Sequence, residues 1–136
     1  MRTVYVDSGA FVALLRRKDR DHHRVAAHLT KIRRAGDRLI TSDAVVSETA
    51  TRLRYDVGLE AALAFRRLLE APGAVAVHGS DRRVRAAAFD VMARYADLRL
   101  SYADCVGAVV ARTARAATVL GLDADFRVLG FALEPA

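Results

Sequence analysis

Thr3-Val4-Tyr5-Val6-Asp7-Ser8-Gly9-Ala10-Phe11 opens the chain and decides the fold class. Its first four residues are mostly β-branched or aromatic, which is typical of a short strand. Phe11, Leu14 and Leu15 follow at helical spacing. We therefore expect a strand that runs directly into a helix, with Asp7 at the exit of the strand.

The same alternation of strand and helix continues to the end of the chain. We predict strands at residues 3–6, 38–41, 74–78, 118–120 and 131–133. We predict helices after residue 7, at 21–34 with Asp21 as N-cap, at 43–56 and 59–70, from Ser80 or Asp81 as the opening residue to about 96, and from about 101. Alternation without a hairpin signal indicates an α/β fold: three α/β/α layers around a mainly parallel sheet of four to five short strands. At 136 residues the chain is expected to form a single domain, 1–136.

Composition excludes several classes of protein. Apolar residues make up 53% and charged residues 28%, a globular balance that argues against a disordered chain. The longest apolar run, residues 105–111, is too short to cross a bilayer, and the N-terminus lacks the pattern of a signal peptide. A single cysteine, Cys105, cannot form an intramolecular disulfide. We expect a cytoplasmic protein without a membrane partner.

The net charge of +6 leaves two explanations open. A basic protein suits a polyanionic partner such as a nucleic acid, because fixed cations replace its condensed counterions. Twenty of the 22 basic residues are arginine and alanine is abundant, however, a bias that genomic base composition alone can produce. Which arginines would contact a nucleic acid is not decided by the sequence.

Acidic residues follow the predicted strands or lie near the starts of helices. Asp7 follows the first strand, Asp123 and Asp125 follow the fourth, Glu48 lies on the helix at 43–56, and Asp104 lies in the first turn of the last long helix. The carboxyl ends of parallel strands share one edge of a sheet, where ligands bind. If the first and fourth strands are neighbours, these carboxylates converge.

Each of these carboxylates also has an ordinary structural explanation. Asp7 suits a helix N-cap, and Ser101-Tyr102-Ala103-Asp104 fits a capping box with Asp in place of Glu. Glu48 fits a solvated helix position, and one of Asp123 and Asp125 fits turn chemistry. No single carboxylate therefore indicates a site, whereas the whole set of acidic residues does.

A cluster of carboxylates requires protons or a cation. Two carboxylates about 4 Å apart repel by roughly 4 kcal/mol at an effective dielectric of about 20. Oxygen ligands without histidine or cysteine select Mg²⁺ or Mn²⁺ over zinc. Such an ion activates water and neutralises charge on a phosphate, which is the chemistry of phosphodiester hydrolysis.

With these residues the sequence resembles the PIN-domain ribonucleases, and among them the VapC-type toxins of toxin–antitoxin pairs. The resemblance is carried by Val4-Tyr5-Val6-Asp7-Ser8-Gly9-Ala10, Ser47-Glu48, Leu100-Ser101-Tyr102-Ala103-Asp104 and Leu122-Asp123-Ala124-Asp125-Phe126. It implies a PIN-like fold and a Mg²⁺- or Mn²⁺-dependent endoribonuclease. It also implies a homodimer, an RNA substrate and inhibition by a cognate VapB-like antitoxin.

The resemblance implies that Asp7, Glu48, Asp104 and Asp123 form the catalytic metal site, with Ser8 as polar support. Family members often carry threonine or serine two residues before the last aspartate, where this chain has Gly121. The fourth carboxylate is therefore open between Asp123, which we prefer because it leaves the strand first, and Asp125.

Other functions remain to be compared with this one. A catalytically silent module that binds RNA or a protein partner on the same fold is the main alternative, although it would gain nothing from clustered negative charge facing phosphate. His22, His23 and His28 are expected to be structural or surface residues, because adjacent histidines at a helix start point apart. Cys105 is expected to be a small buried residue.

Overall fold

A computed structural model describes residues 1–135 of the chain. Its elements are β1 (Thr3–Val6), α1 (Ser8–Leu15), α2 (His22–Arg34), β2 (Arg38–Ser42), α3 (Asp43–Asp56), α4 (Leu59–Glu70), β3 (Ala76–His78), α5 (Arg82–Arg94), the 3₁₀ helix η1 (Ala96–Leu98), α6 (Tyr102–Thr113), β4 (Thr118–Leu120), α7 (Asp125–Val128) and β5 (Leu133–Glu134). Within the described residues, no helix is both long and apolar enough to cross a membrane.

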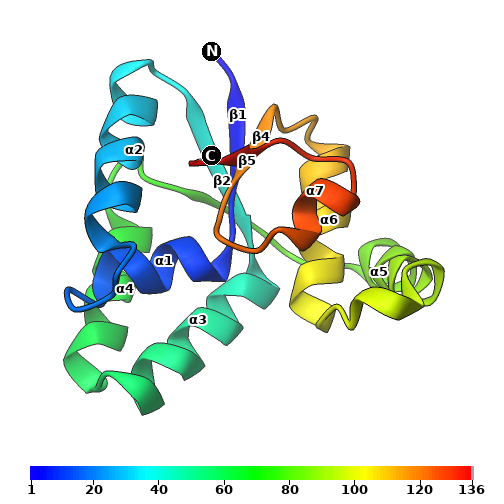
Figure 1. Cartoon of the computed structure of the whole chain (residues 1–136), viewed down its shortest axis with the longest axis horizontal. Helices are drawn as coiled ribbons and strands as arrows, with labels where there is room; N and C mark the ends of the chain where they lie inside the picture. Colours follow the sequence, from blue (N-terminus) through cyan, green and yellow to red (C-terminus); the bar gives the residue numbers. More distant parts are fainter. Residues whose placement is uncertain (136) are drawn as a thin grey trace.

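The strands form one parallel sheet in the order β3-β2-β1-β4-β5. Figure 1 shows α1, α2 and α4 on one side of the sheet and α5 and α6 on the other. This arrangement confirms the predicted three-layer fold with a parallel sheet. The first and fourth strands are neighbours, since Val6 pairs with Leu120 at the carboxyl ends of β1 and β4.

The core fills both sides of the central strand. Tyr5 on β1 is fully buried, and the rings of Phe11 on α1 and Phe65 on α4 lie 5.0 Å apart. The two rings are tilted by 58° and pack α1 against α4, next to the strand exit that precedes α1. The helix pair α3–α4 extends below the sheet in Figure 1.

Several predicted element boundaries were wrong by a few residues. The third strand begins at Ala76 because residues 71–74 form a turn, closed by a hydrogen bond from Ala74 N to Ala71 O. The fifth begins at Leu133, because Phe131 instead packs its ring edge on Phe126 and closes the turn after α7. The helix predicted at 81–96 ends at Arg94, and η1 follows.

The predicted helix caps had mixed outcomes. Asp81 caps α5 as expected, since its Oδ1 accepts from Val84 N at 2.9 Å. Asp21 occupies the N-cap of α2 but its side chain makes no capping bond. Its backbone has a turn conformation instead, and the carboxylate accepts a hydrogen bond from Arg24.

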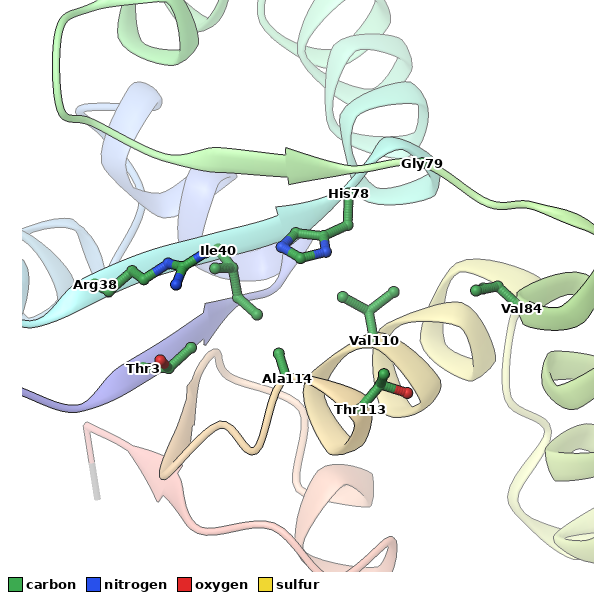
Figure 2. A pocket seen from close by; sticks show the side chains of 9 residues that line it. All are labelled: Thr3, Arg38, Ile40, His78, Gly79, Val84, Val110, Thr113 and Ala114. Carbon is green, nitrogen blue, oxygen red and sulfur yellow. The ribbon is translucent and has the colours of Figure 1, made fainter.

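One face of the sheet beside α6 is not completely filled. Figure 2 shows a cavity between β2, the end of β3 and the C-terminal half of α6, with Ile40, His78 and Val110 around it. Its volume is about 300 Å³. This cavity is separate from the acidic residues, because its lining contains none of them.

Gly107 sets the distance between α6 and the sheet. A Cβ at this position would lie 2.7 Å from the hydroxyl oxygen of Tyr5, which shares a buried 3.0 Å hydrogen bond with Ser42 Oγ. We expect Gly107→Ala to push α6 outward and to lower the free energy of unfolding by about 1–3 kcal/mol, as overpacking does. Urea unfolding measures the change.

The matched control is Gly9→Ala on α1. A Cβ there would meet Leu122 at an ordinary 3.7 Å, so we expect little loss of stability. Equal unfolding midpoints for the two variants would contradict the account of Gly107 as a close-approach position.

Candidate active site at the carboxyl edge of the sheet

The exits of β1 and β4 hold two of the predicted carboxylates side by side. Asp7 follows β1 directly, and its backbone N–H donates to Leu120 O at 3.0 Å. The chain leaves β4 through Gly121 and reaches Asp123 in the next turn. Both carboxylates therefore lie at the carboxyl edge of the sheet, where parallel folds place ligand sites.

Two helices bring the other two carboxylates to the same edge. Ser42 at the end of β2 caps α3 by accepting from Val45 N at 3.1 Å, and Glu48 follows on this helix. Asp104 lies in the first turn of α6, where Ser101 and Asp104 form a complete capping box. The Ser101 N–H donates to Asp104 Oδ2 at 3.0 Å, which fixes the orientation of the carboxylate.

All four carboxylates line one open cavity. Its volume is about 410 Å³. The lining consists of Asp7, Ser8, Gly9, Val12, Asp19, Glu48, Arg52, Arg99, Ser101, Asp104, Leu122 and Asp123. We call this cavity the acidic pocket. The fold thus brings together four carboxylates that are far apart in the sequence, at positions 7, 48, 104 and 123.

Asp7 lies deepest in the acidic pocket. Its side chain is almost fully buried, and Oδ1 has no hydrogen-bond partner. Burial, and then the nearby charges of Asp104, Glu48 and Asp123, raise the pKa of Asp7 from 3.8 to about 7. Asp7 occupies the N-cap position of α1, as expected, but its side chain makes no capping hydrogen bond, so capping does not account for the carboxylate.

Glu48 and Asp104 also differ from ordinary helix residues. Oε2 of Glu48 is buried without a partner, so the prediction of a solvated side chain is wrong. The capping box of Asp104 is confirmed, yet the same carboxylate lines the acidic pocket. Desolvation, with the charges of Glu48 and Asp123, raises the pKa of Asp104 against the hydrogen bonds from Ser101.

Asp123 and Asp125 have different environments. Asp123 lines the acidic pocket, and its Oδ1 accepts from Asp125 N at 2.9 Å, whereas Asp125 begins α7 and is absent from the pocket lining. A Cβ on Gly121 would lie only 3.2 Å from Asp7 Cβ. The glycine that departs from the family pattern therefore stands where the two strand exits approach closely.

The acidic pocket fits a hard divalent cation that keeps much of its hydration. Among residues 1–135, no group of three or more His, Cys, Asp or Glu side chains forms a ready-made ligand cage. Mg²⁺ commonly takes one or two carboxylates and completes its shell with water and phosphate oxygens. The unpartnered buried oxygens of Asp7 and Glu48 would suit such an ion, since a buried carboxylate oxygen without a partner is costly.

Three charged residues of the acidic pocket were missed from the sequence. Arg52 and Arg99 line it, and so does Asp19, whose Oδ1 accepts from Asp21 N in the loop after α1. Arg52 follows Glu48 by four residues on α3, so helical spacing was a usable signal for it. Ser8 also lines the pocket, with Oγ 3.5 Å from Arg52 Nη1.

The histidines and the cysteine lie elsewhere. His22 Nδ1 is 2.8 Å from Ala13 O, and His28 pairs with Glu134 on β5 at 3.2 Å. His23 packs against the ring of His22, and Cys105 is buried and free. None of these four residues lines the acidic pocket, which agrees with the prediction that they are structural or surface residues.

Comparison with solved structures shows the same fold in several proteins. VapC20 of Mycobacterium tuberculosis, described as a sarcin-ricin loop cleaving toxin, is 23% identical with a TM-score of 0.83, over 95% of this chain and 96% of that one. VapBC2 of Rickettsia felis, bound to a promoter DNA fragment, is 11% identical with a TM-score of 0.73, over 97% of both chains. FitAcB of Neisseria gonorrhoeae is 21% identical with a TM-score of 0.66, over 96% and 95%.

A comparison with curated protein sequences finds no match. The profile of the PIN domain matches residues 4–132, a span that contains all four carboxylates and, apart from Thr3, the strands β1 to β4, whereas β5 lies just beyond it. Since this match covers nearly the whole sequence, the chain belongs to the PIN domain family.

Proposed function

We propose that the chain is a Mg²⁺- or Mn²⁺-dependent endoribonuclease and the toxin of a toxin–antitoxin pair. The observation that carries the proposal is the acidic pocket, where carboxylates from β1, α3, α6 and the β4 exit meet and two of their buried oxygens lack partners. Such a pocket repels an RNA phosphate unless a cation lies between them. Membership of the PIN domain family supports nuclease chemistry.

The carboxylates have distinct roles in this proposal. Asp7 and Glu48 supply their unpartnered oxygens to the cation, and Asp104 and Asp123 complete the negative charge around it. The capping box orients Asp104, and the Asp125 N–H orients Asp123. A bound divalent ion would polarise the scissile phosphate and lower the pKa of an attacking water.

RNA is the proposed substrate, and two protein partners are proposed with it. The net charge of +6 favours a polyanion, and the M. tuberculosis protein of similar fold is described as a toxin that cleaves the sarcin-ricin loop. Likeness to VapBC2 and FitAcB supports a cognate VapB-like antitoxin as inhibitor. A second copy of the chain, forming a homodimer, is part of the same proposal.

Cleavage of RNA by the purified chain tests the function. We expect end-labelled RNAs with structured loops to be cut in Mg²⁺ or Mn²⁺ and to stay intact in chelator, because the carboxylates alone offer no Lewis acid. Products are resolved on a denaturing gel. Absence of cleavage across tRNA, rRNA fragments and mRNA in either metal would contradict the proposal and favour a silent RNA- or partner-binding module.

A further inference from the structure

Two arginines line the acidic pocket without neutralising it. Arg52 comes from α3, and Arg99 lies between η1 and α6. Both side chains are exposed, and neither takes part in an ion pair within residues 1–135. Their guanidinium groups are therefore available to a ligand that enters the pocket.

Arg52 is placed by the same helix as Glu48. Residues four apart on a helix share one face, so the arginine stands one turn beyond the glutamate. Its Nη1 lies 3.5 Å from Oγ of Ser8, the residue that follows Asp7. The guanidinium thus borders the carboxylates at the junction of α1 and α3 and keeps most of its donors free.

Arg99 is placed by an unusual backbone conformation. Its φ of 53° and ψ of 42° are left-handed, which L side chains other than asparagine and aspartate seldom adopt. The turn leads directly to Leu100 and Ser101, and Leu100 is buried. The packing of Leu100 and the cap at Ser101 hold this turn, and Arg99 lines the acidic pocket, as Asp104 does.

A bound RNA strand has charges that a single metal site does not neutralise. The cation lies against the scissile phosphate, whereas the neighbouring phosphates still face a pocket of negative charge. Guanidinium groups bind phosphate oxygens through paired N–H donors and stay charged at every working pH. Arginines at the border of an acidic pocket are suited to those neighbouring phosphates.

We propose that Arg52 and Arg99 bind the RNA phosphates that flank the scissile phosphate and so hold the strand across the four carboxylates. The proposal rests on the proposed function for its substrate class. The binding itself does not require the cleavage reaction, so it is measured separately from cleavage.

The test compares Arg52→Gln and Arg99→Gln with two matched controls. Arg54→Gln changes an exposed arginine on the same helix as Arg52, outside the pocket lining. Arg115→Gln changes an arginine with the same left-handed backbone as Arg99, φ 55°, also outside the lining. Arg52→Lys and Arg99→Lys retain the charge without the paired donors.

Binding of a fluorescein-labelled RNA hairpin is measured by anisotropy over a range of salt concentrations at a fixed concentration of Ca²⁺, a hard cation that takes oxygen ligands, and a denaturing gel checks that the RNA stays intact. We expect each pocket variant to weaken binding about 10-fold. The slope of log K against log salt should fall by about 0.7 for each lost contact to single-stranded RNA. The lysine variants should recover the salt slope and only part of the affinity, and the control variants should match the unmodified chain.

Cleavage kinetics in Mn²⁺ give a second readout. We expect the two pocket variants to raise KM about 10-fold with kcat within about threefold, because uniform binding is lost. Pocket variants that match Arg54→Gln and Arg115→Gln in affinity and salt slope would overturn the inference. An unmodified chain that fails to cleave would instead contradict the proposed function, and the anisotropy series would still decide whether these arginines bind RNA.

Discussion

Asp104→Asn is expected to slow RNA cleavage at least about 1,000-fold while leaving the fold intact. The loss corresponds to about 4 kcal/mol of transition-state stabilisation, a magnitude typical of removing charge from a metal-assisted site. An asparagine side-chain oxygen still accepts the Ser101 N–H, so the capping box that starts α6 is retained. Single-turnover cleavage in Mn²⁺ measures the effect, and circular dichroism checks the fold.

Asp125→Asn is the matched control for this substitution. It removes the same charge near the start of a helix, two residues from Asp123 and outside the lining of the acidic pocket. We expect its cleavage rate to stay within about threefold of the unmodified chain. Full activity of Asp104→Asn, or equal losses in the two variants, would contradict the assignment of the acidic pocket as the active site.

Asp7→Asn is expected to raise the melting temperature of the metal-free protein. The pKa of Asp7 is about 7 in the folded chain against the ordinary 3.8 of an aspartate side chain, so the folded state favours the protonated acid. The ionised form therefore costs stability, and this cost grows as pH rises from about 4 to about 7 and is fully present above it. Asparagine carries no charge and avoids the cost.

The expected gain is at least about 1 kcal/mol at pH 8 in chelator, or roughly 4 °C for a chain of this size. The gain should shrink as pH falls below about 7 and approach zero below about pH 3, where the carboxyl group is protonated in both states. Added Mn²⁺ should stabilise the unmodified chain more than the variant, because binding to the folded state alone raises stability. A variant less stable than the unmodified chain at pH 8 in chelator would contradict this electrostatic account.

Much of the fold was predictable because local signals and the sheet topology agree. The strand at Thr3–Val6 with Asp7 at its exit was visible from residue types alone. Parallel order followed from the alternation of strands and helices. The predicted start of β5 was two residues too early. Phe131 packs against the ring of Phe126 instead, a contact that no local pattern reveals.

The residue types of the candidate site could be predicted from the sequence, but the burial and the contacts of their side chains could not. Spacing could not distinguish a solvated Glu48 from one with a buried oxygen, since that depends on α6 packing beside α3. It could not separate Asp123 from Asp125 either, because a turn of two residues decides which carboxylate enters the pocket. The position of Arg99 depends on a left-handed backbone conformation, which the residue type arginine does not predict.

Each sequence signal for the site was weak by itself, because residues of the site also have ordinary structural roles. Asp104 serves as a helix cap and as a pocket carboxylate at once, so either role alone accounts for its position. Gly121 has no side chain to contribute, yet its backbone lies where a Cβ would approach Asp7 within 3.2 Å. The pairing of β1 with β4 brings these positions to one edge of the sheet, as the sequence predicted on the condition that the two strands are neighbours.

The central claim is that one metal-dependent nuclease site is formed by carboxylates 7, 48, 104 and 123. The most direct test is cleavage of one labelled RNA by the unmodified chain and by Asp104→Asn, each in Mn²⁺ and in chelator. The account predicts cleavage in a single combination, the unmodified chain with Mn²⁺. Cleavage by the variant at the rate of the unmodified chain, or by the unmodified chain in chelator, would contradict it.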